Sequence, residues 1–379
     1  MASKPKVRAR PEQLRGLKYL RSFQQLLQPL ADLPVHGNRK FCMDHWVWLL
    51  LLHFFNPILD SLRALQQATD FHDIQEVVGV KHTSLGSMSE SASKVFDPTY
   101  LEPILQQLGR EVQRLPKDRT RDDLPGVPTA VDGSFLRCLP KMVWATFRKK
   151  SGKRGVRLHL HYDIERDIPS AAEITRALGS EKKSLRKLLQ SGKLYLIDRG
   201  YLDYGLYQAI HEAESFFIAR LKDNSSYEVV EDRPLSQADR EVGVVCDQGV
   251  RMGSAFTEGK LTAPVRRLVI RNPEGQEVIL LTNTDLSAEL VGLLYRYRWQ
   301  VELFFRWFKC ILGCRNWLSL SPTGLTLQVY VALLASMLVS LWTGRKPRKS
   351  TFRVICLHLQ GWVRDEELVA HIQRLKEQK

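Results

Sequence analysis

The chain has 379 residues, of which 44% are hydrophobic and 26% are charged. This composition excludes an intrinsically disordered chain and provides apolar residues for one large core or for two to three smaller ones. Lys and Arg number 56 against 41 Asp and Glu, which gives a formal net charge of +15. Such a surplus favours a polyanionic partner, most commonly nucleic acid, with an anionic membrane surface as the competing partner.

The first 115 residues are predicted to form an all-helical unit. Apolar residues recur at helical spacing in 10–30, 43–55, 58–71 and 98–115, and Pro or Asn residues interrupt the pattern at 34–38, 56–57 and 97–98. The segment KDRTRDDLPGVP (117–128) is polar and contains two prolines. It predicts a linker to the next part of the chain.

Strands are predicted to alternate with helices between residues 129 and 225. Strand patterns occupy 129–138, 156–164, 193–201 and 215–223, and helical patterns occupy 181–191 and 203–214. The segment RCLPKMVWATFRKKSGKRG (137–155) contains seven basic residues and no acid, which predicts a hairpin that faces DNA. Residues 226–283 show strand patterns throughout, separated by turn sequences such as NPEGQ.

A helix is predicted to begin near Ser287 and to continue through YRYRWQVELFFRWFK (295–309). One carboxylate, Glu302, lies there among cations and aromatic rings. On a single helix, one face would carry Tyr295, Arg298, Glu302, Arg306 and Lys309. The opposite face would carry an apolar stripe of Leu294, Val301, Phe304, Phe308, Ile311 and Leu312, so we expect this helix to be half buried.

Residues 321–379 are predicted to be helical and include the basic patch RKPRKSTFR. The stretch 325–342 is long and apolar enough to span a membrane, but its Gln, Ser and Thr residues favour a helix buried in a large domain. Six scattered cysteines indicate a reducing compartment rather than a disulfide framework. Cys310 and Cys314 lack the second pair that a structural zinc site would need.

Three acids are candidate ligands for divalent metal ions. Asp132 lies within the first predicted strand, Asp198 ends another, and Glu302 belongs to the late helix. Mg²⁺ prefers carboxylate and phosphate oxygens, and two such ions about 3.5 to 4 Å apart can activate one oxygen and stabilise a leaving one. Cations on the helix face of Glu302 would then bind the phosphates of a nucleic acid strand.

The order Tyr295, Arg298, Glu302 and Lys309, with two, three and six residues between them, resembles the Y-R-E-K signature of a large transposase family. These are the DDE transposases of bacterial cut-and-paste insertion sequences, which have a β-rich insertion before the catalytic glutamate. The segments AVDGSF, LIDRGY and LLTNT are similar to that family's first, second and third blocks. The resemblance covers roughly residues 125 to 320.

This resemblance implies an α/β fold with an RNase H-like (retroviral-integrase-like) catalytic core. It implies a catalytic, metal-binding triad of Asp132, Asp198 and Glu302, which would hold two Mg²⁺ ions per site, with Mn²⁺ as a substitute. Tyr295, Arg298 and Lys309 would contact DNA, and Arg199 and Tyr201 are weaker candidates for the same surface. From the residues alone, Arg306 belongs to the catalytic face, and Trp299 either stacks on an exposed base or packs as an ordinary interface residue.

The expected organisation has five parts: a helical N-terminal DNA-binding domain (1–115), the first part of the catalytic core (125–225), a β-rich insertion (226–283), the second part of the core with the glutamate helix (284–320) and a helical C-terminal region (321–379). The expected partners are double-stranded DNA, as transposon terminal inverted repeats and target DNA, and a second copy of the chain on that DNA. We expect a cytoplasmic, nucleoid-associated protein without a membrane partner.

Some alternatives remain open at this point. Asp163 and Glu165 compete for a metal position, although a solvated strand end is the simpler interpretation. His159 and His161 could bind a transition metal but are more simply packed or turned toward phosphate. Arg220 and Lys222 could point at DNA. A related metal nuclease without strand transfer, or a non-catalytic DNA-binding protein derived from a transposase, are the alternative functions.

Overall fold

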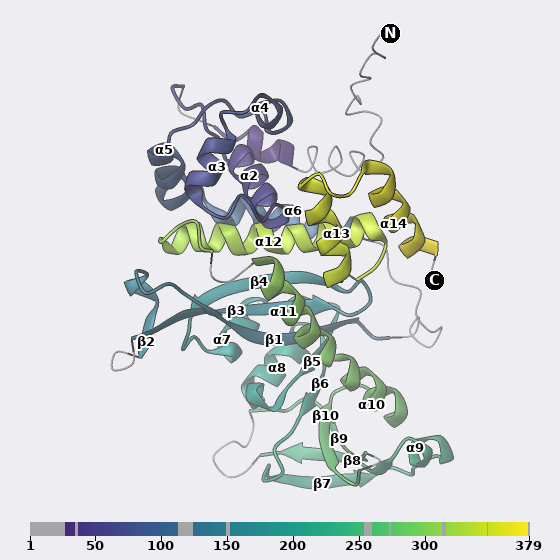
Figure 1. Ribbon diagram of the computed structural model, residues 1–379. Helices are drawn as coiled ribbons and strands as arrows, with labels where there is room; N and C mark the ends of the chain where they lie inside the picture. Colours follow the sequence, from purple (N-terminus) through teal and green to yellow (C-terminus); the bar gives the residue numbers. More distant parts are fainter. Residues whose placement is uncertain are drawn as a thin grey trace. The chain divides into compact units, whose positions relative to one another are not determined.

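The computed structural model describes residues 27–34, 37–112, 124–148, 152–253, 260–272, 274–312, 316–346 and 348–377 (Figure 1). The chain divides into two compact units. We call residues 1–113, 138–144 and 307–379 the helical unit, and residues 114–137 and 145–306 the sheet unit. The N-terminal and C-terminal helical regions, which the sequence suggested as separate parts, therefore belong to one unit.

The helical unit takes its helices from both ends of the chain. They are α2 (Met43–Phe55), α3 (Leu62–Ala68), α4 (His72–Val78), α5 (Leu85–Glu90), η2 (Ser91–Val95), η3 (Pro98–Tyr100), α6 (Leu101–Glu111), α12 (Pro322–Thr343), α13 (Lys349–Leu359) and α14 (Asp365–Glu377). Asn56 caps the end of α2 and Asp97 caps η3 through the Thr99 N–H, as the Asn-Pro and Asp-Pro breaks predict. The part of the predicted N-terminal helix in 10–26 lies outside the described residues.

Helix α12 forms the centre of the helical unit and packs against α2 and α6. It is long and apolar enough to cross a membrane, yet 83% of its apolar stretch is buried inside the protein. Its polar side chains are also satisfied locally, because the Ser336 hydroxyl donates to the Leu333 carbonyl at 2.6 Å and the Tyr330 hydroxyl donates to Glu102 at 3.1 Å. These contacts are those of a core helix.

The sheet unit contains one mixed sheet, which has ten strands within the described residues. They are β1 (Val127–Arg137), β2 (Thr146–Arg148), β3 (Lys153–Asp163), β4 (Ile168–Arg176), β5 (Lys193–Ile197), β6 (Phe216–Arg220), β7 (Tyr227–Asp232), β8 (Val244–Met252), β9 (Val265–Arg271) and β10 (Glu277–Thr282). Their order is β2-β3-β1-β5-β6-β10-β9-β8-β7, and β4 pairs with β3. The 3₁₀ turn η5 (Val143–Ala145) precedes β2.

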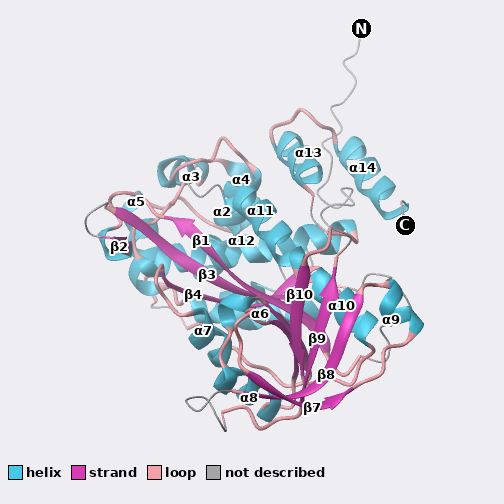
Figure 2. Cartoon of the chain, turned by 90° about the horizontal axis from the view of Figure 1, so that it is seen from below, coloured by secondary structure: helices cyan, strands magenta, loops and turns pink. Residues whose placement is uncertain are grey.

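Strand direction changes along this sheet. Strand β3 pairs antiparallel with both β4 and β1, whereas β1, β5 and β6 run parallel to one another. From β10 to β7 the pairing is antiparallel again, so the β-rich segment predicted in 226–283 continues the same sheet from β6 (Figure 2). The basic hairpin predicted in 137–155 corresponds to β2 and the start of β3, and its tip, residues 149–151, lies outside the described residues.

The two faces of the sheet pack against different helices. Residues paired in register share a face, so Val131, Ile197 and Ala219 point the same way, into a core with Tyr207 of α8 (Tyr204–Glu212). We call this the α8 face; α7 (Glu181–Lys187) also contacts β1 and β3. On the other side, which we call the α11 face, Tyr162 of β3 packs against Phe304 of α11 (Trp299–Leu312) with 5.0 Å between ring centroids.

The single helix predicted from Ser287 to Lys309 is wrong in one respect. It is two helices, α10 (Ala288–Tyr297) and α11, with Arg298 in a turn between them. The Arg298 N–H donates to the carbonyl of Tyr295, three residues back, rather than to that of residue 294. Arg298 itself keeps right-handed helical angles at φ −50 and ψ −35, so the interruption is slight, and its guanidinium still lies over the Tyr295 ring and pairs with Glu302. The apolar stripe is confirmed at Leu294, Val301 and Phe304.

Candidate active site

Asp132 lies on β1, and Asp198 directly follows the neighbouring parallel strand β5. The register pairs Ala130 with Leu196 and Val131 with Ile197. One further step in the same register brings Asp132 beside Asp198, whose backbone is still extended at φ −82 and ψ 163. Adjacent strands are about 4.8 Å apart and side chains alternate between faces. Both carboxylates therefore emerge on the α11 face.

Glu302 approaches the same face from the first turn of α11. Two residues further on, Phe304 packs against Tyr162, which fixes this part of the helix on β3. Glu302 is half-buried, and its charge is close enough to Asp132 to raise the pKa of that aspartate, an effect second to the burial of Asp132 itself. The structure thus brings the three predicted acids to one face of one unit.

Arg298 lies among these acids. Its guanidinium donates to Glu302 Oε1 at 2.8 Å, and both side chains are mostly buried. Burial alone would lower the pKa of Arg298, but the charges of Tyr295, Glu302 and Asp198 raise it above its ordinary value. The guanidinium also lies 6.0 Å from the centroid of the Tyr295 ring. Arg298 is therefore the cation that balances the acidic cluster in this structure.

The pKa of Asp132 indicates whether the three acids suit a divalent cation. Burial raises the pKa of Asp132 to about 6, and Glu302 and Glu181 add to the rise, although the Gly133 N–H and Arg298 oppose it. The Gly133 N–H donates to Asp132 Oδ1 at 2.8 Å. Clustered carboxylates that repel one another in a half-buried position are what a hard divalent cation stabilises. The hydroxyl of Tyr201 is buried and has no hydrogen-bond partner among the described residues. Burial first, and then the charges of Glu181 and Asp132, raise its pKa.

Within the described residues, two other groups hold His, Cys, Asp or Glu ligand atoms within 4.8 Å of one another, and the three acids do not form such a group. One consists of the exposed His72, Asp73 and Glu76, and the other of Cys42, Asp44 and His45. In the second group, His45 Nδ1 accepts the Cys42 N–H at 3.2 Å. That bond leaves the ring proton on Nε2, so the nitrogen that faces Asp44 is closed to a metal.

The residues predicted to contact DNA differ in their exposure. Arg199, Arg306 and Lys309 are exposed, and Trp299 is 46% exposed, with the Arg306 guanidinium 5.5 Å from its ring centroid. The expectation that Tyr201 contacts DNA is corrected, because its side chain is only 2% exposed and belongs to the core on the α8 face. The 3₁₀ turn η7 (Arg199–Tyr201) that follows Asp198 turns its ring inward, so it does not lie on a DNA-binding surface in this structure.

The rivals named from the sequence have structural roles. Asp163 is buried rather than solvated, and its carboxylate accepts the N–H groups of Glu165 and Arg166, which stabilises the turn between β3 and β4. His159 and His161 are packed on the α8 face, where burial lowers their pKa values to about 4 and about 3. His159 Nε2 lies 2.8 Å from the Thr175 hydroxyl. Neutral, packed histidines are thus the interpretation that the structure supports.

Arg220, at the end of β6, is near enough to Tyr295 to lower the pKa of that phenol, against a larger rise from burial that brings it to about 12. Lys222 is exposed. Cys310 is exposed and forms no disulfide, and Cys314 lies outside the described residues. Of Arg220, Lys222 and Cys310, Arg220 is therefore the residue that lies near Tyr295 and the acidic cluster.

Sequence reasoning missed Glu181, the first residue of α7. Its charge is the third contribution that raises the pKa of Asp132, after burial and Glu302. Its carboxylate accepts a hydrogen bond from Arg157 of β3. The only sequence signal would have been an acid at the first position of a helix, which normally indicates no more than helix capping.

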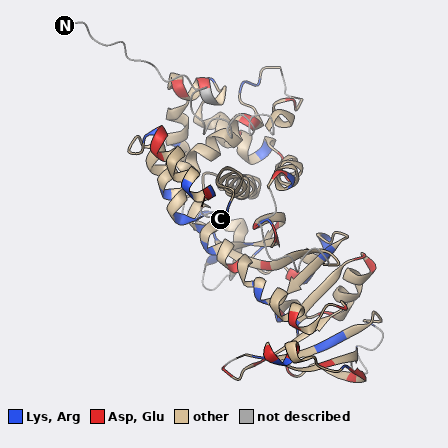
Figure 3. Ribbon diagram, turned by 90° about the vertical axis from the view of Figure 1, so that its right-hand side faces the viewer, with Lys and Arg blue, Asp and Glu red and all other residues tan. Residues whose placement is uncertain are grey.

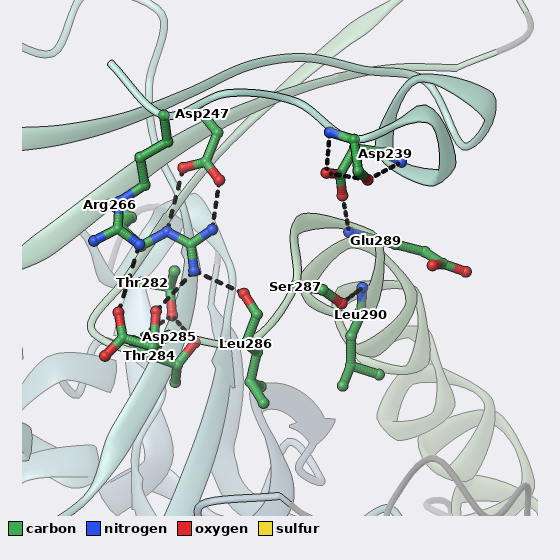
Figure 4. A network of polar contacts seen from close by, with 12 residues as sticks. Asp239, Asp247, Arg266, Thr282, Thr284, Asp285, Leu286, Ser287, Glu289 and Leu290 are labelled. Atoms are coloured by element: carbon green, nitrogen blue, oxygen red, sulfur yellow. Dashed lines mark hydrogen bonds and ion pairs between the residues drawn. The ribbon is translucent and has the colours of Figure 1, made fainter. Parts of the chain in front are cut away.

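A buried network anchors the beginning of α10 (Figure 4). Arg266 of β9 donates to both carboxylate oxygens of Asp247 of β8, at 3.2 and 2.5 Å, and to the carbonyls of Thr284 and Leu286 at 3.1 and 2.7 Å. Ser287 caps the helix by accepting the Leu290 N–H. A cavity of about 670 Å³ opens beside this network, and none of the three acids lines it.

Comparison with known proteins identifies relatives of this chain. Residues 124–338 match a family model described as "Transposase DDE domain". The putative transposase y4zB of Sinorhizobium fredii (strain NBRC 101917 / NGR234) is 36% identical over 199 residues, which are 52% of this chain and 55% of that protein. The chain thus matches about half the length of this relative.

Two further similarities cover more of the chain. The probable transposase for insertion sequence element IS5377 of Geobacillus stearothermophilus is 24% identical over 310 residues, 79% of this chain and 78% of that one. A cryo-EM structure of the piggyBac transposase synaptic complex with hairpin DNA covers 94% of this chain and 81% of its own, at 11% identity and a TM-score of 0.42. The family match spans more than half of the chain and includes all three acids, so the chain belongs to the family of transposases with a DDE domain.

Proposed function

We propose that this protein is a transposase that cuts DNA at transposon ends and transfers the cut strands into target DNA. The observation that carries the proposal is the register of β1 and β5, which brings Asp132 beside Asp198, on the face to which α11 delivers Glu302. The strand order β4-β3-β1-β5-β6, with three antiparallel strands followed by two parallel ones, supports an RNase H-like core for this site.

The three carboxylates would hold two divalent cations, with Mg²⁺ as the expected ion. When bound, such ions activate a water or a 3′ hydroxyl and stabilise the leaving oxygen at phosphorus. The chain's own residues orient the DNA for that step. Arg298, which is paired with Glu302 in this structure, would exchange this carboxylate for a DNA phosphate as Glu302 turns to the cations.

The Y-R-E-K residues supply the nearest DNA contacts in this proposal. Tyr295 and Arg298 lie near enough to Asp198 for its charge to raise the pKa of each. Lys309 is exposed two turns beyond Glu302 on α11. Arg199 is exposed next to Asp198 and would add a phosphate contact. Trp299 and Arg306 form an exposed cation–π pair on the same helix, which would stack on a base unpaired near the cut.

The partners of this reaction are the two ends of a mobile element and a target duplex. Because both ends must be cut together, we propose that two copies of the chain assemble on the DNA. The helices before residue 112 would bind the terminal inverted repeats, in the cytoplasm, where the bacterial nucleoid lies. The net charge of +15 supports a DNA partner.

The deciding experiment incubates the purified protein and Mg²⁺ with a duplex that carries the inverted repeats flanking its gene, and with Glu302→Gln in parallel. We expect the unaltered protein to cut at the repeat end and the variant to bind the repeat without cutting, because an amide is a weak ligand for hard cations. The exposed Glu289, on α10, gives a matched control, and Glu289→Gln should cut normally.

Cutting by Glu302→Gln at the rate of the unaltered protein would contradict the role of this glutamate. The products also separate the proposed function from its alternative. Repeat ends joined to new DNA indicate a transposase, whereas cut ends that are never joined indicate a related metal nuclease that uses the same three acids.

A further inference from the structure

Glu181 and Arg157 form an ion pair on the α8 face, behind the two aspartates. Arg157 faces Phe135 in the register of β3 with β1, and its guanidinium donates to Glu181 Oε1. The Glu181 side chain is 24% exposed and that of Arg157 is 32% exposed. The pair therefore joins the beginning of α7 to the sheet next to the strand that carries Asp132.

The Glu181 carboxylate lies close to Gly133, which follows Asp132, and near Gly200, two residues after Asp198. A Cβ added at Gly133 would lie 2.8 Å from Glu181 Oε1, and one added at Gly200 would lie 3.6 Å from Oε2. One carboxylate thus spans the two segments that carry the aspartates, and the approach to Gly133 is this close because glycine has no side chain.

The same end of α7 is also tied to the segment after Asp198. Lys182 Nζ donates to the Leu202 carbonyl at 2.6 Å. Between these contacts lies Tyr201, whose buried hydroxyl faces the charges of Glu181 and Asp132. The contacts of Glu181 and Lys182 are those expected of residues that fix the spacing of two neighbouring strand ends.

We propose that Glu181 is a positioning residue of the catalytic centre, which fixes the separation of Asp132 and Asp198 from the opposite face of the sheet and adds negative charge behind them. It is not a ligand in this proposal, because its carboxylate is paired with Arg157 on the opposite face of the sheet from the three acids. Its effect is tighter binding of divalent cations at the three acids. The inference rests on the proposed function only in taking these acids as the cation site.

The test measures Mn²⁺ affinity by electron paramagnetic resonance, in which the signal of free Mn²⁺ decreases as the ion binds. It uses the full-length protein without DNA. Partners that orient ligands typically contribute 10-fold to 100-fold in metal affinity. We expect Glu181→Gln, which keeps the size and removes the charge, to weaken Mn²⁺ binding by about 10-fold or more. Glu181→Asp should recover part of the loss, and binding to the inverted repeat in the absence of metal should not change in either variant.

Glu173 provides the matched control, because it also pairs with α7. It accepts a hydrogen bond from Lys187, the last residue of that helix, at 2.6 Å. Glu173→Ala removes an anchor of α7 without touching Gly133 or Gly200. We expect it to leave the Mn²⁺ affinity unchanged while it lowers the melting temperature about as much as Glu181→Gln does.

Equal weakening in Glu173→Ala and Glu181→Gln would overturn the proposal, since the effect would then come from anchoring the helix. Unchanged affinity in Glu181→Gln would overturn it as well. Failure of the proposed function has another signature. In that case the unaltered protein binds Mn²⁺ and the variant binds it more weakly, yet neither cuts or joins the repeat DNA.

Discussion

A single side chain, Asp132, shows how the candidate site lowers the stability of the folded protein. The carboxyl is half-buried next to Glu302 and Glu181, and burial first of all raises its pKa to about 6. An ionised carboxylate in this position destabilises the folded protein unless a cation is bound. Residues of this kind are retained for function rather than for stability.

This predicts a pH-dependent gain in stability for Asp132→Asn without metal. The folded protein holds the Asp132 proton up to about pH 6 and the unfolded chain releases it near 3.8, so wild-type stability falls as pH rises through this window. Asn is neutral throughout. At pH 8 the variant should be more stable by roughly 3 kcal/mol, and at pH 4 the gain should largely disappear.

Thermal unfolding in EDTA at the two pH values measures this difference. The control is Asp285→Asn, because the Asp285 side chain is 92% exposed and its stability effect should stay within about 0.5 kcal/mol at both. A gain for Asp132→Asn that is as large at pH 4 as at pH 8 would show that the ionised carboxylate is not its cause.

The candidate site was predictable from the sequence to the extent that its residues carry strand or helix patterns. Asp132 and Asp198 were located on strands, and the register then brings them together. Tyr201 was misplaced because a short 3₁₀ turn, which leaves no clear pattern, decides which way its ring points. Glu181 was missed because its partners, Gly133 and Gly200, meet it only after the strands have paired.

At the scale of elements, the acids depend on where α10 begins. Arg266 pairs with Asp247 and holds the carbonyls of Thr284 and Leu286 directly before the Ser287 cap (Figure 4). Asp239 adds a second fixed point, because its carboxylate accepts the Glu289 N–H at 3.2 Å. From there α10 leads to Arg298 and α11 to Glu302, so the strands β8 and β9 set the position of residues in the candidate site.

We therefore expect Asp247→Ala to be strongly destabilising. Arg266 and Asp247 are 7% and 8% exposed, so the substitution leaves a buried guanidinium without its carboxylate. Such a change typically costs about 3 to 5 kcal/mol. Chemical denaturation measures it, with Glu277→Ala as the control, since its ion pair with Arg271 is exposed and should contribute less than about 1 kcal/mol. Similar losses in the two variants would contradict the importance of the buried network.

Two elements departed from expectation for physical reasons. Strand β4 (IPSAAEITR) was not predicted, because Ala and Glu favour helices in isolation, whereas here pairing with β3 decides the conformation. The break at Arg298 was missed because every residue around it is compatible with a helix. The strands with strong β-branched and aromatic patterns were predicted, although β5 ends at Ile197, four residues before the predicted end, and β6 covers Phe216–Arg220 within the predicted 215–223.

For the whole molecule, the charge surplus has a direct thermodynamic consequence. Lys and Arg occur on helices and strands alike, interspersed with acids (Figure 3). The logarithm of the DNA affinity should fall linearly with the logarithm of salt concentration, at about 0.9 per phosphate neutralised. We expect Lys309→Ala to reduce this slope by about one, measured by fluorescence anisotropy with an inverted-repeat duplex.

Lys376→Ala, which changes an exposed lysine on α14, should leave the slope unaltered. If Lys309→Ala weakens binding without changing the slope, then Lys309 acts through packing rather than through phosphate contact. An equal change of slope in the two variants would mean that the affinity reports general charge rather than a contact at Lys309.

The assembly of the helical unit from both ends of the chain has a consequence for biosynthesis. Helices α2 and α6 leave the ribosome early, but α12, against which they pack, is synthesised only after the entire sheet unit. Until α12 is synthesised, Trp46, Leu50 and the other apolar residues of α2 cannot be fully buried. Nascent chains would therefore carry exposed apolar helices for most of translation, a state that invites chaperone binding and makes expression sensitive to elongation rate.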